Sequence, residues 1–113
     1  MSDSVVPTEA YRVVVRPGEK RVRVVFAGVT VADSTDIRVL YETRLPPVYY
    51  FPKKDVRMEY LQRTDFRTHC PFKGNASYWA IEVDDVREDN VVWAYEEPFH
   101  EAQEISGCLA FTW

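Results

Sequence analysis

Short runs of alternating apolar and polar residues recur along this chain, and they constrain its fold more than any other feature. Arginine and valine alternate over residues 21–24, and the pattern resumes over residues 29–32 after Ala27 and Gly28. Successive side chains of a strand point to opposite faces, so this period of two predicts half-buried β-strands. We expect residues 21–32 to form a hairpin or a strongly bent strand.

Further strands are predicted between clusters of turn-forming residues. The predicted strands cover residues 37–42, 48–51, 77–83, 91–95 and 108–113, with an acidic loop over 84–90 and a short irregular or helical piece over 101–105. One short helix is expected near residues 55–62, where Asp55 can act as the N-cap and Val56, Tyr60 and Leu61 share a face. The pattern indicates an all-β, mainly antiparallel fold, either a sandwich or a half-open barrel.

Length and charge limit the organisation of the chain. At 113 residues it fits one domain over 1–113, in which residues 1–10 are expected to be a loosely ordered N-terminal segment. Fourteen Lys and Arg against eighteen Asp and Glu give a net charge of −4, which argues against a protein that coats nucleic-acid duplexes. A nucleic-acid partner is therefore not expected, although a local basic patch stays open, and the oligomeric state is not determined.

The first residues and the absence of a long apolar run indicate a cytoplasmic protein. Residues 1–7 contain no basic segment followed by an apolar run, and no stretch has the apolar length of a membrane span, so neither a secretory signal nor a membrane partner is expected. In that compartment Cys70 and Cys108 are expected to be reduced thiols.

Several blocks of residues, taken together and in order, resemble one known family. They are residues 28–34 (Gly-Val-Thr-Val-Ala-Asp-Ser), 40–42 (Leu-Tyr-Glu), 48–52 (Val-Tyr-Tyr-Phe-Pro) with Asp55-Val56, 70–74 (Cys-Pro-Phe-Lys-Gly) with Tyr78-Trp79, 93–95 (Trp-Ala-Tyr) with Pro98, and Ala110-Phe111. Across residues 22–113 these blocks resemble the domain of unknown function 427 family.

The resemblance implies a compact β-tent-like fold, related in shape to zinc-binding domains such as methionine sulfoxide reductase B and the cereblon ligand-binding domain. It implies no settled activity. A nucleotidyltransferase name is attached to the family, but this sequence has no Gly-Ser motif followed by paired aspartates. Many β-tent relatives bind zinc between two Cys-x-x-Cys pairs, and because this chain has neither pair, no metal and no cofactor are expected.

Cys70 is the sharpest candidate for chemistry. It lies three residues before Lys73 in a glycine-containing turn, where an ammonium group could favour the thiolate and make it a nucleophile. The alternative is a small buried apolar residue, since free cysteine is among the most buried residue types. A redox pair with Cys108 is a further alternative.

Two carboxylates are candidates for acid–base work because they lie at strand ends. Glu42 follows an apolar strand and precedes Pro46-Pro47, so an inward-pointing side chain would need a partner such as Lys73 or a tyrosine hydroxyl. Asp33 can serve in the same way or can simply form the turn. A solvated strand end is the alternative for Glu42.

Aromatic residues occur in adjacent or nearly adjacent pairs on three of the predicted strands. Alternation sends one residue of a neighbouring pair into the core and the other to the opposite face, which predicts a second aromatic surface suited to ligand binding. The alternative is a core on both sides. The residues are Tyr49, Tyr50, Tyr78, Trp79, Trp93 and Tyr95.

Charge is distributed unevenly along the chain. Five cations occur within residues 12–23, whereas residues 82–104 hold nine acids and the single cation Arg87. This asymmetry could orient a partner or an anionic ligand, or it could simply reflect solvated edges and loops.

The sequence favours a small-molecule-binding domain or small enzyme with an aromatic-lined pocket; whether it is catalytic stays open. Cys70, Lys73 and Glu42 are the predicted catalytic groups, and the predicted ligand-binding residues are Tyr50, Tyr78, Trp79, Trp93, Tyr95 and Asp33. The alternatives are a non-catalytic module for a protein or single-stranded nucleic acid and a thiol-dependent redox protein.

Overall fold

The computed structural model describes residues 11–112, and this part of the chain is built from strands and three short 3-10 helices, labelled η. The elements in order are β1 (Val13–Pro17), β2 (Val22–Phe26), β3 (Val29–Ser34), β4 (Arg38–Glu42), β5 (Val48–Tyr50), η2 (Lys53–Asp55), η3 (Met58–Tyr60), β6 (Leu61–Cys70), β7 (Gly74–Val83), β8 (Val86–Tyr95), η4 (His100–Ile105) and β9 (Ala110–Phe111). The predicted loose order of residues 1–10 and the predicted place of Trp113 in the last strand lie outside the described residues.

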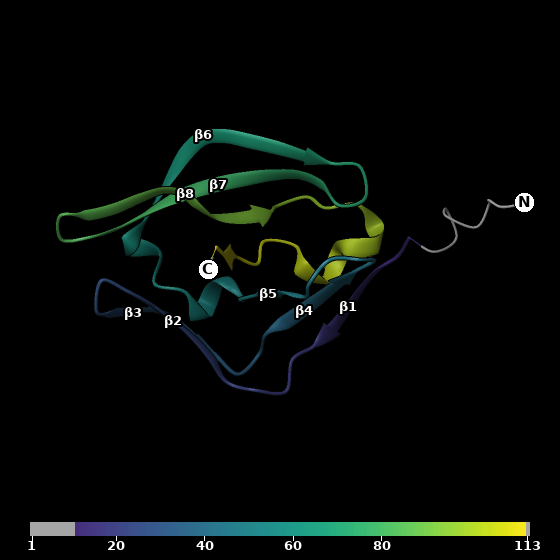
Figure 1. The fold of residues 1–113 in the computed structure, drawn as a ribbon, viewed down its shortest axis with the longest axis horizontal. Helices are drawn as coiled ribbons and strands as arrows, with labels where there is room; N and C mark the ends of the chain where they lie inside the picture. Colours follow the sequence, from purple (N-terminus) through teal and green to yellow (C-terminus); the bar gives the residue numbers. More distant parts are fainter. Residues whose placement is uncertain (1–10, 113) are drawn as a thin grey trace, which may run out of the picture.

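All strand pairs are antiparallel, which confirms the all-β class. The sheets have the orders β1-β4-β5, β2-β3 and β6-β7-β8-β9, and residues 11–112 form no closed barrel. A bridge between Phe51 and Leu109 joins the first sheet to the last, with both backbone N–H groups donating, over 2.8 and 2.9 Å. Figure 1 shows the result as two layers, β6, β7 and β8 above and β1 to β5 below, with η4 and the C-terminal strand between them.

The hairpin expected over residues 21–32 is confirmed as β2 and β3. Ala27 and Gly28 form its turn with φ angles of 49° and 81°. Two successive positive φ values are typical of the tight turns that match the twist of paired strands. A register shift between Val24 and Val25 bends the hairpin.

The segment near residues 55–62 contains the two 3-10 turns η2 and η3 in place of one continuous helix. Val56, between them, is extended and pairs with Ala32 of β3. The Arg57 N–H donates to the Val31 carbonyl over 2.8 Å. The pairing of Val56 and Arg57 with β3 therefore separates the two 3-10 turns and prevents one continuous helix, and Leu61 already begins β6.

The acidic loop predicted over residues 84–90 is wrong, because β8 begins at Val86. Asp84, with a φ of 55°, makes the tight turn between β7 and β8, and the charged residues that follow lie on an exposed strand. Strands β1 and β6 were not predicted. Residues of β6 between Leu61 and Cys70 are nearly all exposed, since β6 is the edge of its sheet, so they show no apolar alternation.

The core consists of two clusters on opposite faces of β4 and β5. Val39 and Phe51 pack into the first cluster with the β2–β3 hairpin, whereas their neighbours Leu40 and Tyr50 pack into the second. The second cluster contains Tyr95 from β8, together with Ala102 and Ile105 of η4. The face of β4 that carries Leu40 also carries Glu42, and because the second cluster covers this face, Glu42 is buried. No helix in the described part of the chain is long and apolar enough to span a membrane.

Candidate functional site

Glu42, at the end of β4, is buried and forms an ion pair with Lys73 from the turn between β6 and β7. The residues are 8% exposed each. Lys73 Nζ donates to one carboxylate oxygen of Glu42, and the hydroxyl of Tyr11 donates to the other. The pair therefore connects the lower layer of the fold to the end of the upper layer.

The contacts of Glu42 keep its carboxylate ionised. Burial by itself would raise its pKa, but the hydrogen bonds from Lys73 and Tyr11 and the charge of Lys73 outweigh burial and lower the pKa below its ordinary value. The hydrogen bond between Tyr11 and Glu42 raises the pKa of Tyr11 to about 12. At neutral pH the Glu42 side chain is thus a carboxylate and the Tyr11 side chain a neutral phenol.

The turn that carries Lys73 is fixed by its backbone. The Lys73 N–H donates to the Cys70 carbonyl over 3.2 Å, and the Lys73 carbonyl accepts from the Phe99 N–H over 2.9 Å. Gly74 follows with a φ of 113°, which a residue with a side chain rarely adopts. This turn directs Lys73 inward, while Tyr11 and Phe72 stack with ring centroids 4.1 Å apart.

Two buried tyrosines surround the ion pair. The Tyr50 hydroxyl accepts from Trp93 Nε1 over 3.2 Å, and the Tyr95 ring centroid lies 5.8 Å from Lys73 Nζ. Burial raises the pKa of Tyr50 to about 12 and also raises that of Tyr95. Both phenols are therefore neutral, and their rings give the ion pair an apolar surrounding.

Beyond the buried tyrosines, the aromatic residues near the ion pair are partly exposed. Tyr78 and Trp93 lie side by side on β7 and β8 with ring centroids 6.5 Å apart, and each retains part of its accessible surface. The Tyr78 hydroxyl shares a hydrogen bond of 2.9 Å with Thr68. Phe66, 47% exposed, packs edge-on against Tyr78.

Both cysteines in the described residues are free thiols in the second core cluster. Cys70 is half-buried at its turn, whereas Cys108 is 6% exposed. Burial raises the pKa of Cys108, which disfavours its thiolate. Of the two, Cys70 is the more accessible.

Two predicted site residues lie away from this cluster. Asp33, on β3, accepts two hydrogen bonds from Arg21, over 2.7 and 2.8 Å, and lies 3.7 Å from Arg23 Nε. Trp79 belongs to the first core cluster and lies under the Arg63 guanidinium, 5.2 Å from the ring centroid. The other predicted residues, Glu42, Tyr50, Cys70, Lys73, Tyr78, Trp93 and Tyr95, gather around the second core cluster.

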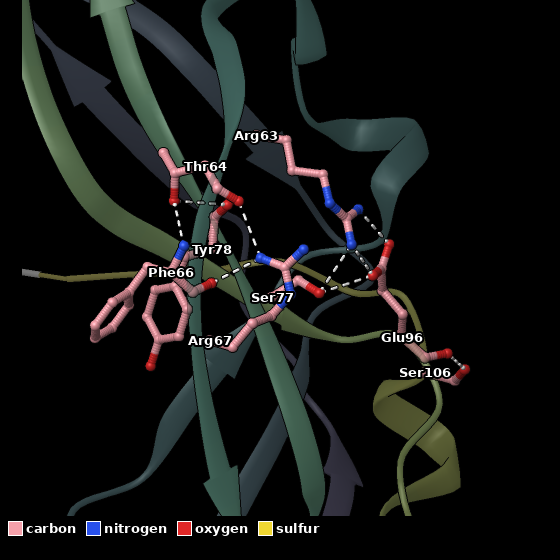
Figure 2. Close-up of polar contacts among 8 residues, drawn as sticks. All are labelled: Arg63, Thr64, Phe66, Arg67, Ser77, Tyr78, Glu96 and Ser106. Carbon is pink, nitrogen blue, oxygen red and sulfur yellow. Dashed lines mark hydrogen bonds and ion pairs between the residues drawn. The ribbon is translucent and has the colours of Figure 1, made fainter.

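A second polar network was not predicted. Arg63 donates to both carboxylate oxygens of Glu96 over 2.9 and 2.7 Å and to Ser77 Oγ over 3.0 Å, and Ser77 donates to Glu96 over 2.9 Å (Figure 2). The Arg63 hydrogen bonds lower the pKa of Glu96 to about 2. This network borders a polar hollow of about 920 Å³ that is also lined by Arg67, His69 and Asn75.

Two sets of polar contacts were missed in the sequence, for different reasons. Tyr11 lies in a stretch without any alternating pattern, and nothing in the sequence links it to Glu42, 31 positions away. The Arg63 network depends on the register of β6 against β7, which pairs Arg63 with Trp79 and Arg67 with Ser77. Among residues 11–112, no group of three or more His, Cys, Asp and Glu side chains is arranged to hold a metal ion.

Comparison with protein-family models gives a match. The family model described as "Domain of unknown function (DUF427)" matches residues 14–113. No curated protein matches the chain.

Proposed function

Since the chain belongs to the DUF427 family, whose description assigns no activity, we propose a function from the site itself: this domain binds a small molecule beside the Glu42–Lys73 pair. In this proposal the Lys73 ammonium attracts an anionic or strongly polar group of the ligand. Tyr78 and Trp93 contact its apolar part.

The observation that carries the proposal is the burial of the ion pair. Removing two charges from water costs several kcal/mol per ion, on the order of what their attraction returns, and apolar residues of similar volume are often at least as stable. A buried pair is therefore weak support for a purely stabilising role. Buried ionisable groups held beside a partly exposed edge are typical of functional sites.

The origin of the residues supports the same location. Glu42, Tyr50, Lys73 and Trp93 come from four separate blocks of the chain, and these are four of the blocks through which the sequence resembles its family. Each block contributes one of the polar or aromatic groups that meet around the second core cluster.

The protonation states favour binding over acid catalysis. Glu42 is held as a carboxylate by Lys73 and Tyr11, so it can accept a hydrogen bond from a ligand N–H or O–H but has no proton to donate at neutral pH. Cys70, half-buried at the same turn, lies at the edge of this arrangement. We assign it to the lining of the site.

The test is a fragment screen with a matched pair of variants. Thermal-shift measurements with a library of small carboxylates, phosphates and aromatic acids should find compounds that stabilise the wild type, and a compound at 100 times its Kd should add about 2.7 kcal/mol. The double variant Glu42→Gln/Lys73→Met removes both charges together, so neither is left buried alone. It should fold and lose the stabilisation.

The control variant is Arg63→Gln, which breaks the exposed pair with Glu96 and leaves the Glu42 site intact. Hits should stabilise this variant as they do the wild type. Compounds that bind the double variant as tightly as the wild type, or that lose binding in Arg63→Gln instead, would place the ligand elsewhere and contradict the proposal.

A further inference from the structure

The outer face of the β1-β4-β5 sheet, opposite Glu42, carries exposed aromatic rings. Tyr41 and Tyr49 are 44% and 40% exposed. Tyr49 pairs with Val39, and Tyr41 lies two residues further along the same face of β4, so the two residues are diagonal neighbours, whose Cα atoms are about 7–8 Å apart in such a pair. Exposed tyrosines at this spacing provide two flat surfaces side by side.

Cations border the two rings. Arg16 lies on β1 and Arg12 directly precedes it, on either side of Val14, the residue paired with Tyr41, so the two arginines are separated by about 13 Å along the extended chain. Lys20 lies on the segment that leads into β2. Within residues 11–112, none of these three side chains has an ion-pair partner, unlike Arg21, which pairs with Asp33.

The rings and cations share one concave surface, which we call the basic trough. It consists of two adjoining hollows of about 470 and 350 Å³ that have Arg16 and Tyr41 in common. Lys20, Pro47 and Tyr49 line the larger hollow, and Arg12 lines the smaller one. The acids that line the trough are Glu19 and Glu42, and Glu42 is already paired with Lys73, so positive charge prevails in the trough of a chain whose net charge is −4.

We propose that the basic trough binds single-stranded nucleic acid. Unpaired cations along a groove follow a phosphate backbone, while exposed rings stack on unpaired bases, and this combination is the general basis of sequence-tolerant single-strand binding. An acidic peptide would satisfy the cations but would leave the two tyrosine faces without a role. The cations and rings of the trough lie on the opposite face of the sheet from the Glu42 side chain, although Glu42 also lines the smaller hollow, so the trough borders the proposed small-molecule site.

The test is fluorescence anisotropy with a labelled twelve-nucleotide oligothymidylate. Binding should saturate, and log K should fall with log salt concentration with a slope of about −2, as three phosphate contacts to a single strand give. Arg16→Ala should reduce that slope by about 0.7. Tyr41→Ala and Tyr49→Ala should each weaken binding by about 5- to 100-fold, and Tyr41→Phe should retain it because stacking needs only the ring.

Matched controls lie outside the trough. Lys53→Ala removes an exposed cation and Phe66→Ala an exposed ring, and both should bind like the wild type. Circular dichroism of every variant checks that the fold is retained. All the trough residues changed are exposed, so folding should persist.

Three results would overturn the proposal. The first is the absence of saturable binding at low salt. The second is polyglutamate competing as well as the oligonucleotide while the tyrosine variants bind normally, which would indicate an acidic protein partner. The third is thymidine monophosphate competing equally per molecule, which would make the trough a mononucleotide site.

Discussion

At the scale of single residues, the same ion-pair chemistry has two different settings in this protein. Glu42 and Lys73 meet in the interior with side chains 6% and 11% exposed, whereas Glu96 and Arg63 meet at the surface with 44% and 45% exposed. The buried pair is costly to form and strongly affected by its surroundings, while the exposed pair is screened by water. Because the buried Glu42–Lys73 pair is costly to form, we propose a function for it. Because water screens the Arg63–Glu96 pair, we expect that pair to have a modest effect on stability.

From the exposed Arg63–Glu96 pair we predict how the stability of the fold changes in acid. The folded state lowers the pKa of Glu96 from 4.5 to about 2, so the contact stabilises the fold fully above pH 4.5 and is lost as the pH falls toward 2. Glu96→Gln should therefore lower the free energy of unfolding at pH 7 by about 1 kcal/mol or less. Wild type and variant should converge between pH 4.5 and 2, as measured by urea denaturation at a series of pH values.

The control is the same change in an Arg63→Gln background. Without the guanidinium, Glu96→Gln should have little effect on stability at any pH. A constant difference between wild type and variant from pH 7 to pH 2 would show that Glu96 does not titrate as described.

At the scale of elements, short turns decide where the site residues point. The turn between β6 and β7 directs Lys73 inward because Gly74 takes a φ of 113° and the Lys73 carbonyl is held by Phe99. The turn between β2 and β3 contains Gly28 at a φ of 81°, with open space around it. The φ angle of Gly28 lies close to the left-handed region that asparagine tolerates, whereas the φ angle of Gly74 lies well outside that region.

Asparagine substitutions test this difference. Gly74→Asn should lower the free energy of unfolding by about 1–3 kcal/mol, because its φ is accessible essentially to glycine alone. Gly28→Asn should cost clearly less, since asparagine is common in tight hairpin turns. Urea denaturation followed by tryptophan fluorescence measures both, and equal losses would contradict the role assigned to Gly74.

At the scale of the whole molecule, one junction joins the β1-β4-β5 sheet to the β6-β7-β8-β9 sheet through paired backbone groups. Phe51 is fully buried, pairs with Leu109 through two backbone hydrogen bonds and packs edge-on against Phe111 at 5.5 Å. It therefore links the sheet that carries Glu42 to the sheet that carries Trp93 and Tyr95. Loss of this side chain would loosen the alignment of the two halves of the site.

Phe51→Ala should lower the free energy of unfolding by about 3–5 kcal/mol, the usual cost of a large cavity in a core. Phe66→Ala, at a site 47% exposed, should cost much less. Thermal and urea denaturation compare the two. A loss at Phe51 no greater than at Phe66 would show that the junction is not central to stability.

The sequence by itself determined the class of the fold, the β2–β3 hairpin and the family. These depend on period-two alternation, a turn at Ala27-Gly28 and blocks of residues in order, all of which are local or directly readable. It also offered Lys73 or a tyrosine hydroxyl as the partner of an inward Glu42, because a buried carboxylate needs a partner, but it left a solvated strand end as the alternative.

Only the tertiary structure decided the rest. The edge strand β6 has no apolar alternation, because nearly all of its side chains face water, and residues 86–90 extend a strand despite their charge. The register of strand pairing decides which face of a sheet each side chain occupies. As a result, Trp79 and Asp33 lie away from the Glu42–Lys73 pair, whereas Tyr11 contacts Glu42. The basic trough likewise exists because β4 and β5 place Tyr41 and Tyr49 beside Arg16, and that proximity follows from strand order rather than from chain order.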